Sequence, residues 1–202
     1  MRPYTAVSAG AAGRLRHCRS PRSPTSMRRS LLLVWHSRTG HAEQMAAAIE
    51  RGAISAAAEM GSELAVVSRR AADASTEDVL SASGYAFCAP ENLASTSGAM
   101  LEFFHRTYYD AFDDEEVSRI LGRPVAVAVA AGSDGSNAAR QMERICRGWR
   151  LAPVADTLVS QNGLIQTKAN ILQPKVLDAS TRDRCHELGG LVAGTILLSD
   201  EG

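Results

Sequence analysis

Residues 31–42 read LLLVWHSRTGHA, an apolar run that stops abruptly in a short turn rich in hydroxyl groups and glycine. Residues 31–35 predict a buried strand, because the run is too short for a helix and is bounded by turn-forming residues. The turn at 37–41 leads directly into residues 42–60, an alanine-rich segment with Met45 and Ile49 on one helical face. The sequence therefore predicts a turn at the N-terminus of a helix.

This turn has the chemistry of an anion site. The first N–H groups of a helix lack internal partners, and the macrodipole adds partial positive charge there. Ser37 and Thr39 add two hydroxyl donors, and Gly40 lets the backbone approach a ligand closely. A phosphate monoester is the expected occupant. The same residues also suit a plain strand-to-helix turn with an N-cap, so the turn alone leaves both interpretations open.

Composition indicates one large domain, or one domain with a tail, in a chain of 202 residues. The content of 45% hydrophobic and 22% charged residues is typical of a globular protein. The longest apolar runs, at 125–131 and 191–198, are far shorter than the roughly 18 residues that a membrane span requires. No membrane span is therefore expected.

Cysteine usage favours a reducing compartment. The four cysteines lie far apart without a CxxC pair, which argues against a disulfide framework and against a zinc site. They are Cys18, Cys88, Cys146 and Cys185. We expect packing residues, no bound metal and a cytoplasmic location.

The N-terminal residues differ in kind from the rest. Residues 1–30 carry seven arginines and no Asp or Glu, which leaves 15 basic against 22 acidic residues in the remainder, a formal charge of −7. Residues 1–29 lack any apolar period and are predicted to be a disordered basic extension, with the domain at 30–202. We expect a dispensable extension, or a start residue assigned too far upstream, since Met27 lies just before the first strand. A transit peptide and a nucleic-acid-binding arm are the alternatives, although no nucleic-acid partner is expected.

Units of strand and then helix repeat along the chain. The predicted strands are 31–35, 63–67, 84–89, 124–131 and 154–159. The predicted helices are 42–60, 75–81, one that ends near 109, 136–148 and one that starts near 180. Such alternation predicts a doubly wound α/β domain, with a five-stranded parallel sheet in the order 2-1-3-4-5 and helices on both faces.

Three loops rich in small polar residues follow strands 1, 3 and 4, at 37–41, 90–98 and 132–135. These strands are neighbours in the predicted order, so the loops should meet at the carboxyl edge of the sheet, where such folds bind ligands. Residues 160–177 form a long segment without period, which is expected to be functional or mobile. We expect this segment and the loop at 90–98 to select the substrate.

The loops resemble those of a known family. Ser37-Arg38-Thr39-Gly40 resembles the phosphate-binding loop of flavodoxins, Ser/Thr-x-Thr-Gly-x-Thr, and Gly40-His41 resembles the variant in quinone-reducing flavodoxin-like flavoproteins. Residues 88–98 and 131–135, with the aromatic pairs at 103–104 and 108–109, look like the flavin-contacting parts of bacterial flavodoxin-family NAD(P)H-dependent oxidoreductases. The similarity covers about residues 30–198.

The resemblance implies an FMN-binding domain whose three loops divide the cofactor between them. The phosphate would be held by Ser37, Arg38, Thr39, Gly40 and His41. The isoalloxazine would lie along Pro90, Glu91, Asn92 and Leu93, with its other edge closed by Gly132, Ser133, Asp134 and Gly135. This sequence departs from the pattern at His41, which replaces the final Thr and removes a hydroxyl donor, and at Ala89, where many relatives carry Thr. A moderate affinity for FMN is therefore expected.

The expected function is an FMN-dependent oxidoreductase that accepts hydride from NAD(P)H and passes electrons to a quinone-like or other small acceptor. No catalytic side chain is expected, because the flavin itself carries the chemistry. Backbone N–H groups at Asn92 and Asp134 are candidates for tuning the ring, although Glu91 and Asp134 could serve only as loop-closing caps. The chain has no GxGxxG fingerprint, so a nicotinamide would have to stack on the flavin.

Two alternatives remain open. A flavodoxin-type electron carrier is disfavoured because neither 90–98 nor 131–136 contains an aromatic residue and −7 is only mildly acidic. A doubly wound domain that binds another phosphate ligand, or none, is the third interpretation. Separately, the aromatic residues Phe103, Phe104, Tyr108 and Tyr109 suggest a homodimer contact or higher oligomer, with core packing as the alternative.

Overall fold

Strand β1 (Ser30–Trp35) lies inside one parallel sheet in the computed structural model, which describes residues 29–199. In spatial order the strands are β2 (Ala65–Arg70), β1, β3 (Gly84–Asn92), β5 (Pro124–Ala131) and an edge position shared by β6 (Ala152–Pro153) and β7 (Leu158–Gln161). The predicted order 2-1-3-4-5 is therefore confirmed. Of the extension predicted at residues 1–29, residues 1–28 lie outside the described residues.

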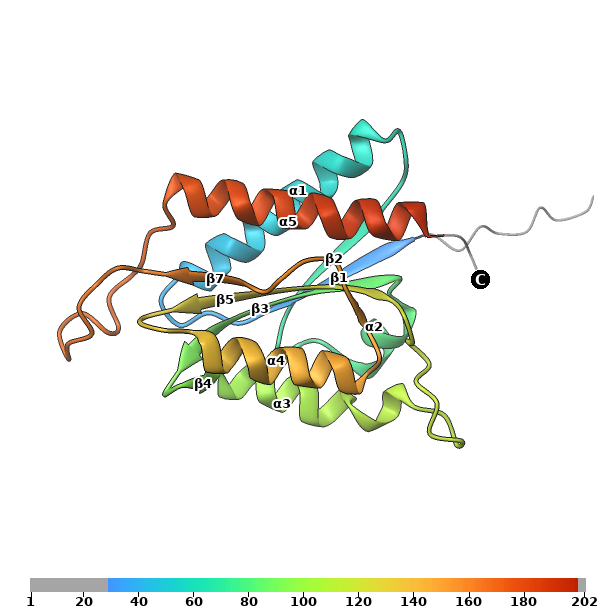
Figure 1. Cartoon of the computed structure of the whole chain (residues 1–202), viewed down its shortest axis with the longest axis horizontal. Helices are drawn as coiled ribbons and strands as arrows, with labels where there is room; N and C mark the ends of the chain where they lie inside the picture. The colour runs from blue at the N-terminus through green and yellow to red at the C-terminus, as the bar shows by residue number, and fades with distance from the viewer. Residues whose placement is uncertain (1–28, 200–202) are drawn as a thin grey trace, which may run out of the picture.

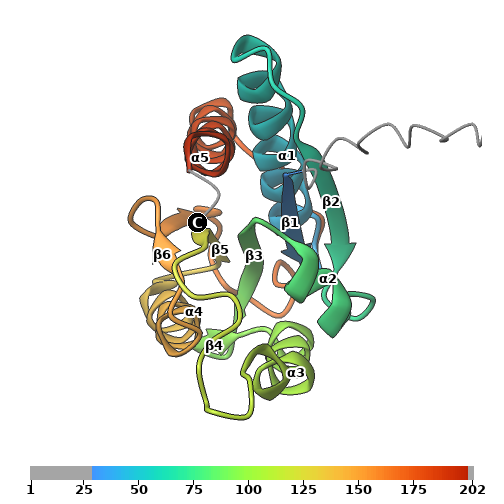
Figure 2. The same ribbon diagram turned by 90° about the vertical axis from the view of Figure 1, so that its right-hand side faces the viewer.

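Helices cover both faces of the sheet (Figures 1 and 2). They are α1 (His41–Glu59), α2 (Thr76–Ser81), α3 (Gly98–Thr107), α4 (Ser136–Gly148) and α5 (Ala179–Leu198), with a 3₁₀ turn at Tyr109–Ala111. Helices α1 and α5 lie on one face, and α3 and α4 lie on the other, as the end-on view of Figure 2 shows. None of the helices among residues 29–199 is both long and apolar enough to cross a membrane.

The sheet buries side chains on both faces. Leu31 and Leu33 of β1 pack into the core beneath α1 and α5, whereas Leu32 and Val34 pack into the core on the side of α3 and α4. Residues that alternate along a strand point to opposite faces, so a strand covered on both sides reads as a continuous apolar run. This explains why the stretch at 31–35 is apolar throughout.

The aromatic residues of α3 belong to the core. Phe103 and Phe104 are buried and contact Phe87 and Trp149, with ring centroids between 5.2 and 6.4 Å apart. Tyr108 stacks on Trp149 at 5.8 Å. Core packing therefore accounts for Phe103, Phe104 and Tyr108, whereas Tyr109, the fourth aromatic residue considered for a dimer contact, is 81% exposed.

Three cysteines in the described part of the chain are buried and free: Cys88, Cys146 and Cys185. Burial raises the pKa of the Cys146 and Cys185 thiols to about 12, and it raises the pKa of Cys88 as well. These thiols are therefore protonated packing residues, as predicted.

The second strand is displaced from its predicted range. The strand was predicted at 63–67, whereas β2 starts at Ala65 and continues through residues 68–70. The pairing with β1 runs from Ser30↔Ala65 to Trp35↔Arg70, so β1 supplies backbone partners for the polar residues. Because β2 is an edge strand with exposed residues at its end, polar side chains there remain in water.

The third strand continues past Pro90, where the sequence predicted its end. The N–H of His36 donates to the carbonyl of Cys88 at 3.0 Å, so the backbone groups of Cys88 face β1. Backbone direction alternates along a strand, and the missing N–H of Pro90 therefore points to the same side, beyond the last residue of β1. Because Pro90 costs no hydrogen bond with β1, the strand continues to Asn92.

The fifth strand, predicted as one element at 154–159, is broken. Residues Ala152–Pro153 pair with the start of β5 and Leu158–Gln161 with its end, while residues 154–157 bend away. In this bend the Thr157 hydroxyl donates to the Glu143 carboxylate at 2.6 Å. A polar turn at a sheet edge costs little, because the backbone groups that it frees can reach water.

Candidate functional site

The turn between β1 and α1 forms a compact cap at the start of the helix. Gly40 has φ +86, a left-handed conformation that a side chain disfavours, and its N–H donates to the Ser37 hydroxyl at 3.0 Å. The N–H of Gln44 donates to the Gly40 carbonyl at 3.1 Å and is the first to enter the helical pattern. The preceding N–H groups of the first turn are those a helix leaves without internal partners, so this end can accept an anion.

The loop after β3 is a tight hairpin rather than an open loop. Strand β4 (Ser95–Thr96) pairs antiparallel with the end of β3, and Leu93 and Ala94 form the turn with φ of 53 and 57. Such a turn requires positive φ at both central positions, which Asn and Gly adopt more easily than Leu and Ala. Leu93 is fully exposed at the tip. The hairpin therefore holds strained backbone beside the site.

The loop after β5 is fixed by two carboxylates. The Glu91 carboxylate accepts the N–H of Gly135 at 3.1 Å, and the Asp134 carboxylate accepts the hydroxyl of Ser136. Gly135 has φ +73, and a Cβ there would lie 2.6 Å from the Val159 side chain. Both acids thus act as loop-closing groups, the alternative that the sequence left open for them, while Glu91 still faces the site.

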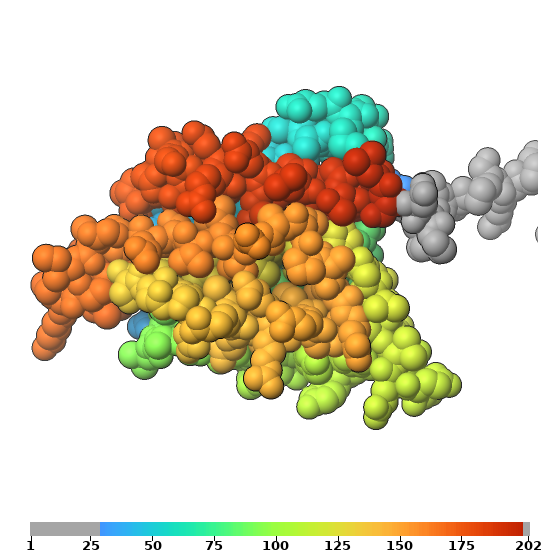
Figure 3. All heavy atoms as spheres, in the orientation of Figure 1, coloured from blue at the N-terminus to red at the C-terminus, as the bar shows by residue number. Residues whose placement is uncertain are grey.

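Residues 162–177, here called the strap, cross the carboxyl edge of the sheet and project beyond it (Figures 1 and 3). At its start, the N–H of Asn162 donates to the Ala131 carbonyl at 3.0 Å, and the Gln166 amide donates to the Gly132 carbonyl at 3.1 Å. The strap is therefore tied to the loop after β5.

Gln44 of α1 ties the other end of the strap. Its amide donates to the carbonyls of Gly40 at 3.0 Å and Lys175 at 2.7 Å, and its carbonyl accepts the N–H of Leu177 at 3.1 Å. The N–H of Lys175 in turn donates to the Thr39 carbonyl at 2.8 Å. The strap and the turn at the start of α1 are therefore parts of one hydrogen-bonded wall.

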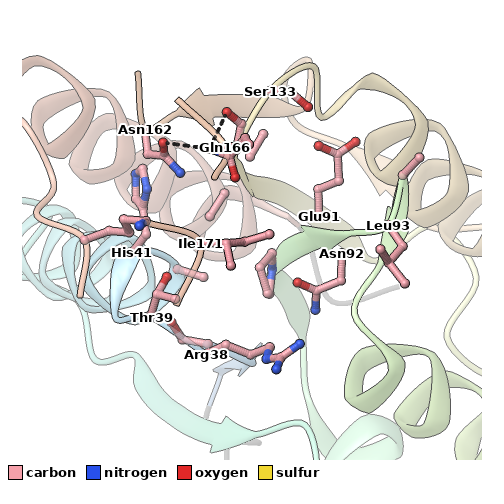
Figure 4. Close-up of a pocket in the computed structure, with 18 of the residues that line it drawn as sticks. Arg38, Thr39, His41, Glu91, Asn92, Leu93, Ser133, Asn162, Gln166 and Ile171 are labelled. Atoms are coloured by element: carbon pink, nitrogen blue, oxygen red, sulfur yellow. Dashed lines mark hydrogen bonds between the residues drawn. The ribbon is translucent and has the colours of Figure 1, made fainter. Parts of the chain in front are cut away.

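These segments enclose a pocket of about 570 Å³. Its wall includes Ser37, Arg38, Thr39, His41, Pro90, Glu91, Asn92, Leu93, Gly132, Ser133 and Asp134. Figure 4 shows Thr39 and His41 on one side and Glu91, Asn92 and Leu93 on the other, with Ile171 between them. The three loops predicted to meet do meet here. A volume of this size is in the usual range for small-molecule and cofactor sites.

Gly40 and Gly135 are the two predicted site residues that do not line the pocket. Both adopt positive φ immediately before a helix, at the N-caps of α1 and α4. They therefore shape the loops from behind, and the neighbouring residues supply the pocket surface.

Several lining residues were not singled out from the sequence. They are Ala42, Ala94, Ala130, Ala131, Asn137, Asn162, Gln166, Ile171, Leu172 and Lys175. Five of them belong to the strap, for which the only sequence signal was an unusually long segment without period. No sequence pattern indicated which residues of the strap would line the pocket.

His41 is buried and forms part of the pocket wall. Its Nε2 lies 3.0 Å from the Ser160 hydroxyl. Burial lowers the pKa of His41, the Asp178 carboxylate opposes that effect, and the Lys175 ammonium lowers the pKa further. A neutral ring bonded to Ser160 is therefore a structural part of the wall.

His36 precedes the turn and lies partly buried. Its Nδ1 is shielded from solvent and has no hydrogen-bond partner among residues 29–199. Burial lowers the pKa of His36, and the guanidinium groups of Arg38 and Arg70 lower it further. Two cationic side chains therefore act on this end of the turn.

Comparison with known proteins identifies the fold. No family model and no curated protein matches the sequence. A flavodoxin from the domain Archaea superposes with a TM-score of 0.61 at 16% identity, over 83% of this chain and 99% of its own. An oxidoreductase from Corynebacterium diphtheriae gives 0.65 at 18% identity, over 87% and 100%. A flavodoxin, WrbA-like protein from Agrobacterium tumefaciens gives 0.56 at 12%, over 85% and 99%. The chain has a flavodoxin-like fold.

Proposed function

We propose that this protein is an FMN-dependent oxidoreductase that accepts hydride from NAD(P)H and passes electrons to a quinone-like or other small acceptor. The observation that carries the proposal is the pocket at the carboxyl edge of the sheet, where the helix-start turn meets two further loops. Doubly wound folds bind ligands at this edge. We place the FMN-binding unit at residues 30–202.

The residues present fit a phosphate-bearing flavin. One end of the pocket offers the hydroxyl groups of Ser37 and Thr39, the Arg38 guanidinium and the backbone of His41, and Gly40 shapes this turn from behind. Phosphate groups bind well where helix N–H groups, hydroxyls and cations converge. These five residues would hold the phosphate of FMN.

The other end of the pocket suits a flat ring. Residues 90–93 would run along it, and residues 132–135 would close its far edge. At Gly132 a Cβ would lie 2.6 Å from the Gln166 side-chain amide, so a larger residue would displace that amide from its contact with the loop. Bound FMN would supply the redox chemistry, and the protein supplies binding, orientation and electrostatics.

The pocket surface favours an enzyme over an electron carrier. Among residues 29–199 no aromatic side chain lines the pocket, so the ring would have no aromatic cover and a nicotinamide or quinone could stack on it. Leu93, Ile171 and Leu172 line the pocket with at least half of each side chain exposed. Exposed apolar side chains in the pocket wall suit an acceptor with an apolar face.

Binding of FMN to the full chain tests the first half of the proposal. We expect the flavin absorbance bands to shift and its fluorescence to change on titration. Thr39→Val should weaken FMN about tenfold, because it removes a hydroxyl hydrogen bond to the phosphate. The control Thr195→Val, on the exposed side of α5, should bind like the parent. A protein that ignores added FMN would remove both the enzyme and the carrier.

Turnover tests the second half. Stopped-flow and steady-state oxidation of NADH or NADPH by the FMN-loaded protein, with a benzoquinone as acceptor, should show repeated turnover. Binding of FMN without oxidation of either nicotinamide would favour the flavodoxin-type carrier instead.

A further inference from the structure

Lys175 places a buried cation in the strap beside the helix-start turn. The residue is only 5% exposed and lines the pocket. Its Nζ donates to the carbonyl of Asn170, and no carboxylate lies within ion-pair distance of it in the described part of the chain. A buried ammonium without a counter-charge is costly, because a hydrogen bond to one carbonyl offsets only part of its desolvation.

The backbone of Lys175 is fixed to the proposed phosphate end of the pocket. Its N–H donates to the Thr39 carbonyl at 2.8 Å, and its carbonyl accepts a hydrogen bond from the Gln44 side-chain amide at 2.7 Å. Burial is the main cause of the lowered pKa of His41, the first residue of α1; the Asp178 carboxylate opposes it, and the Lys175 ammonium lowers the pKa further. The ammonium therefore acts on the same small volume as the start of α1.

The carboxylates near this volume are already hydrogen-bonded to other groups of the protein. The nearby Asp178 carboxylate caps α5 by accepting the N–H of Thr181 at 2.9 Å, and the carboxylates that line the pocket, Glu91 and Asp134, are bonded into the loop after β5. The His41 ring bonds to the Ser160 hydroxyl and is neutral, so it adds no positive charge to this volume. Lys175 can supply what His41 does not.

We propose that Lys175 is the buried charge partner of a phosphate monoester seated at the start of α1. This inference rests on the proposed function only for the identity of the ligand, FMN. A buried lysine from the strap then makes binding depend on the phosphate more strongly than hydroxyls and backbone N–H groups alone would. The bound phosphate would in turn hold the strap against α1, because the same residue contacts both.

Binding of FMN and riboflavin, which differ by the phosphate, tests the assignment in the full-length protein. Lys175→Met should weaken FMN about 10- to 100-fold and change riboflavin affinity less than threefold. Lys175→Arg should stay within about fivefold of the parent for FMN. Lys168→Met, which removes the other lysine of the chain from an exposed site in the same strap, should leave both affinities unchanged.

Circular dichroism establishes whether each variant folds. If Lys175→Met does not fold, the FMN affinity of Lys175→Arg is the measurement that tests the assignment. Equal weakening of FMN and riboflavin, an unchanged FMN affinity in Lys175→Met, or loss of FMN in a folded Lys175→Arg would overturn the assignment. If the parent binds neither flavin, the proposed function fails, and the melting temperature with inorganic phosphate decides the inference alone. Stabilisation of the parent but not of Lys175→Met supports it, and any other result refutes it.

Discussion

Two glutamines hold opposite walls of the pocket, and the walls they hold differ. Gln44 on α1 joins the helix-start turn to the strap through three hydrogen bonds, and that wall also contains the buried Lys175 and His41. Gln141 on α4 holds the β3–β4 hairpin by accepting from Ser95 and Thr96, both at 2.9 Å. The Gln44 wall has polar anchoring groups, whereas the hairpin wall has strained backbone and the exposed Leu93 at its tip.

The difference separates two tasks within one pocket. Backbone and side-chain bonds across the Gln44 wall restrict motion, which suits tight retention of a charged group. The hairpin wall carries the polar groups of Glu91 and Asn92 but ends in the exposed apolar Leu93, which suits a partner that arrives and leaves. The changes described below each affect one wall, so that the two walls can be compared.

Gln44→Ala should have the largest effect. Three hydrogen bonds are lost, and each is worth about 0.5–1.5 kcal/mol, so the free energy of unfolding should fall by about 2–3 kcal/mol. FMN affinity should fall as well, because the strap is no longer held against the turn. Urea denaturation and FMN titration measure both quantities. A loss of stability below about 0.5 kcal/mol would mean that the strap is not held through Gln44.

Gln141→Ala is the matched change on the hairpin wall. It removes two hydrogen bonds, so we expect a stability loss of about 1–2 kcal/mol. FMN affinity should change less than in Gln44→Ala, while the KM for the electron acceptor should rise, since the hairpin tip would be less well placed. If both variants weaken FMN equally and leave the KM for the acceptor alone, the division of tasks is wrong.

Ala94→Gly should make the protein more stable. Ala94 has φ 57, a left-handed conformation that costs a non-glycine residue about 1 kcal/mol, and glycine relieves that cost at some loss of chain entropy. We expect a net gain of about 0.5 kcal/mol in urea denaturation. Ala72→Gly, in the exposed turn after β2, lacks positive φ and should not stabilise. Stabilisation accompanied by slower turnover would indicate that the strain serves the reaction.

The sequence predicted the parts of this pocket that are local. The apolar run at 31–35, the turn at 37–41 and the helix after it are contiguous, so turn chemistry and periodicity are enough to find them. The convergence of three loops followed from strand order, which alternation of strands and helices strongly restricts. For this reason most predicted site residues do line one pocket.

What the sequence missed depends on contacts between distant residues. Whether Pro90 ends β3 depends on which neighbour its missing N–H would face, and that requires the register with β1. The bonds of Gln44 and Gln141 join segments that no local pattern connects. Lys175 lies in a segment without period, and its importance becomes visible only once it is found buried beside Thr39.

Lowering the pH should destabilise the Gln44 wall, and we expect this effect to be the smallest of the four predictions. Burial lowers the pKa of His36 and His41, so below about pH 6.5 the unfolded chain binds more protons than the folded one. The free energy of unfolding should therefore fall as the pH drops from 7 towards 5, a loss that ends once the pH is below the folded pKa values. Urea denaturation of the parent, His41→Asn and the double variant with His36→Asn measures the slope. The slope should decrease stepwise in that order, because both histidines lie next to the helix-start turn and neither lies in the hairpin. An unchanged slope in the double variant would place the acid-sensitive groups outside this wall.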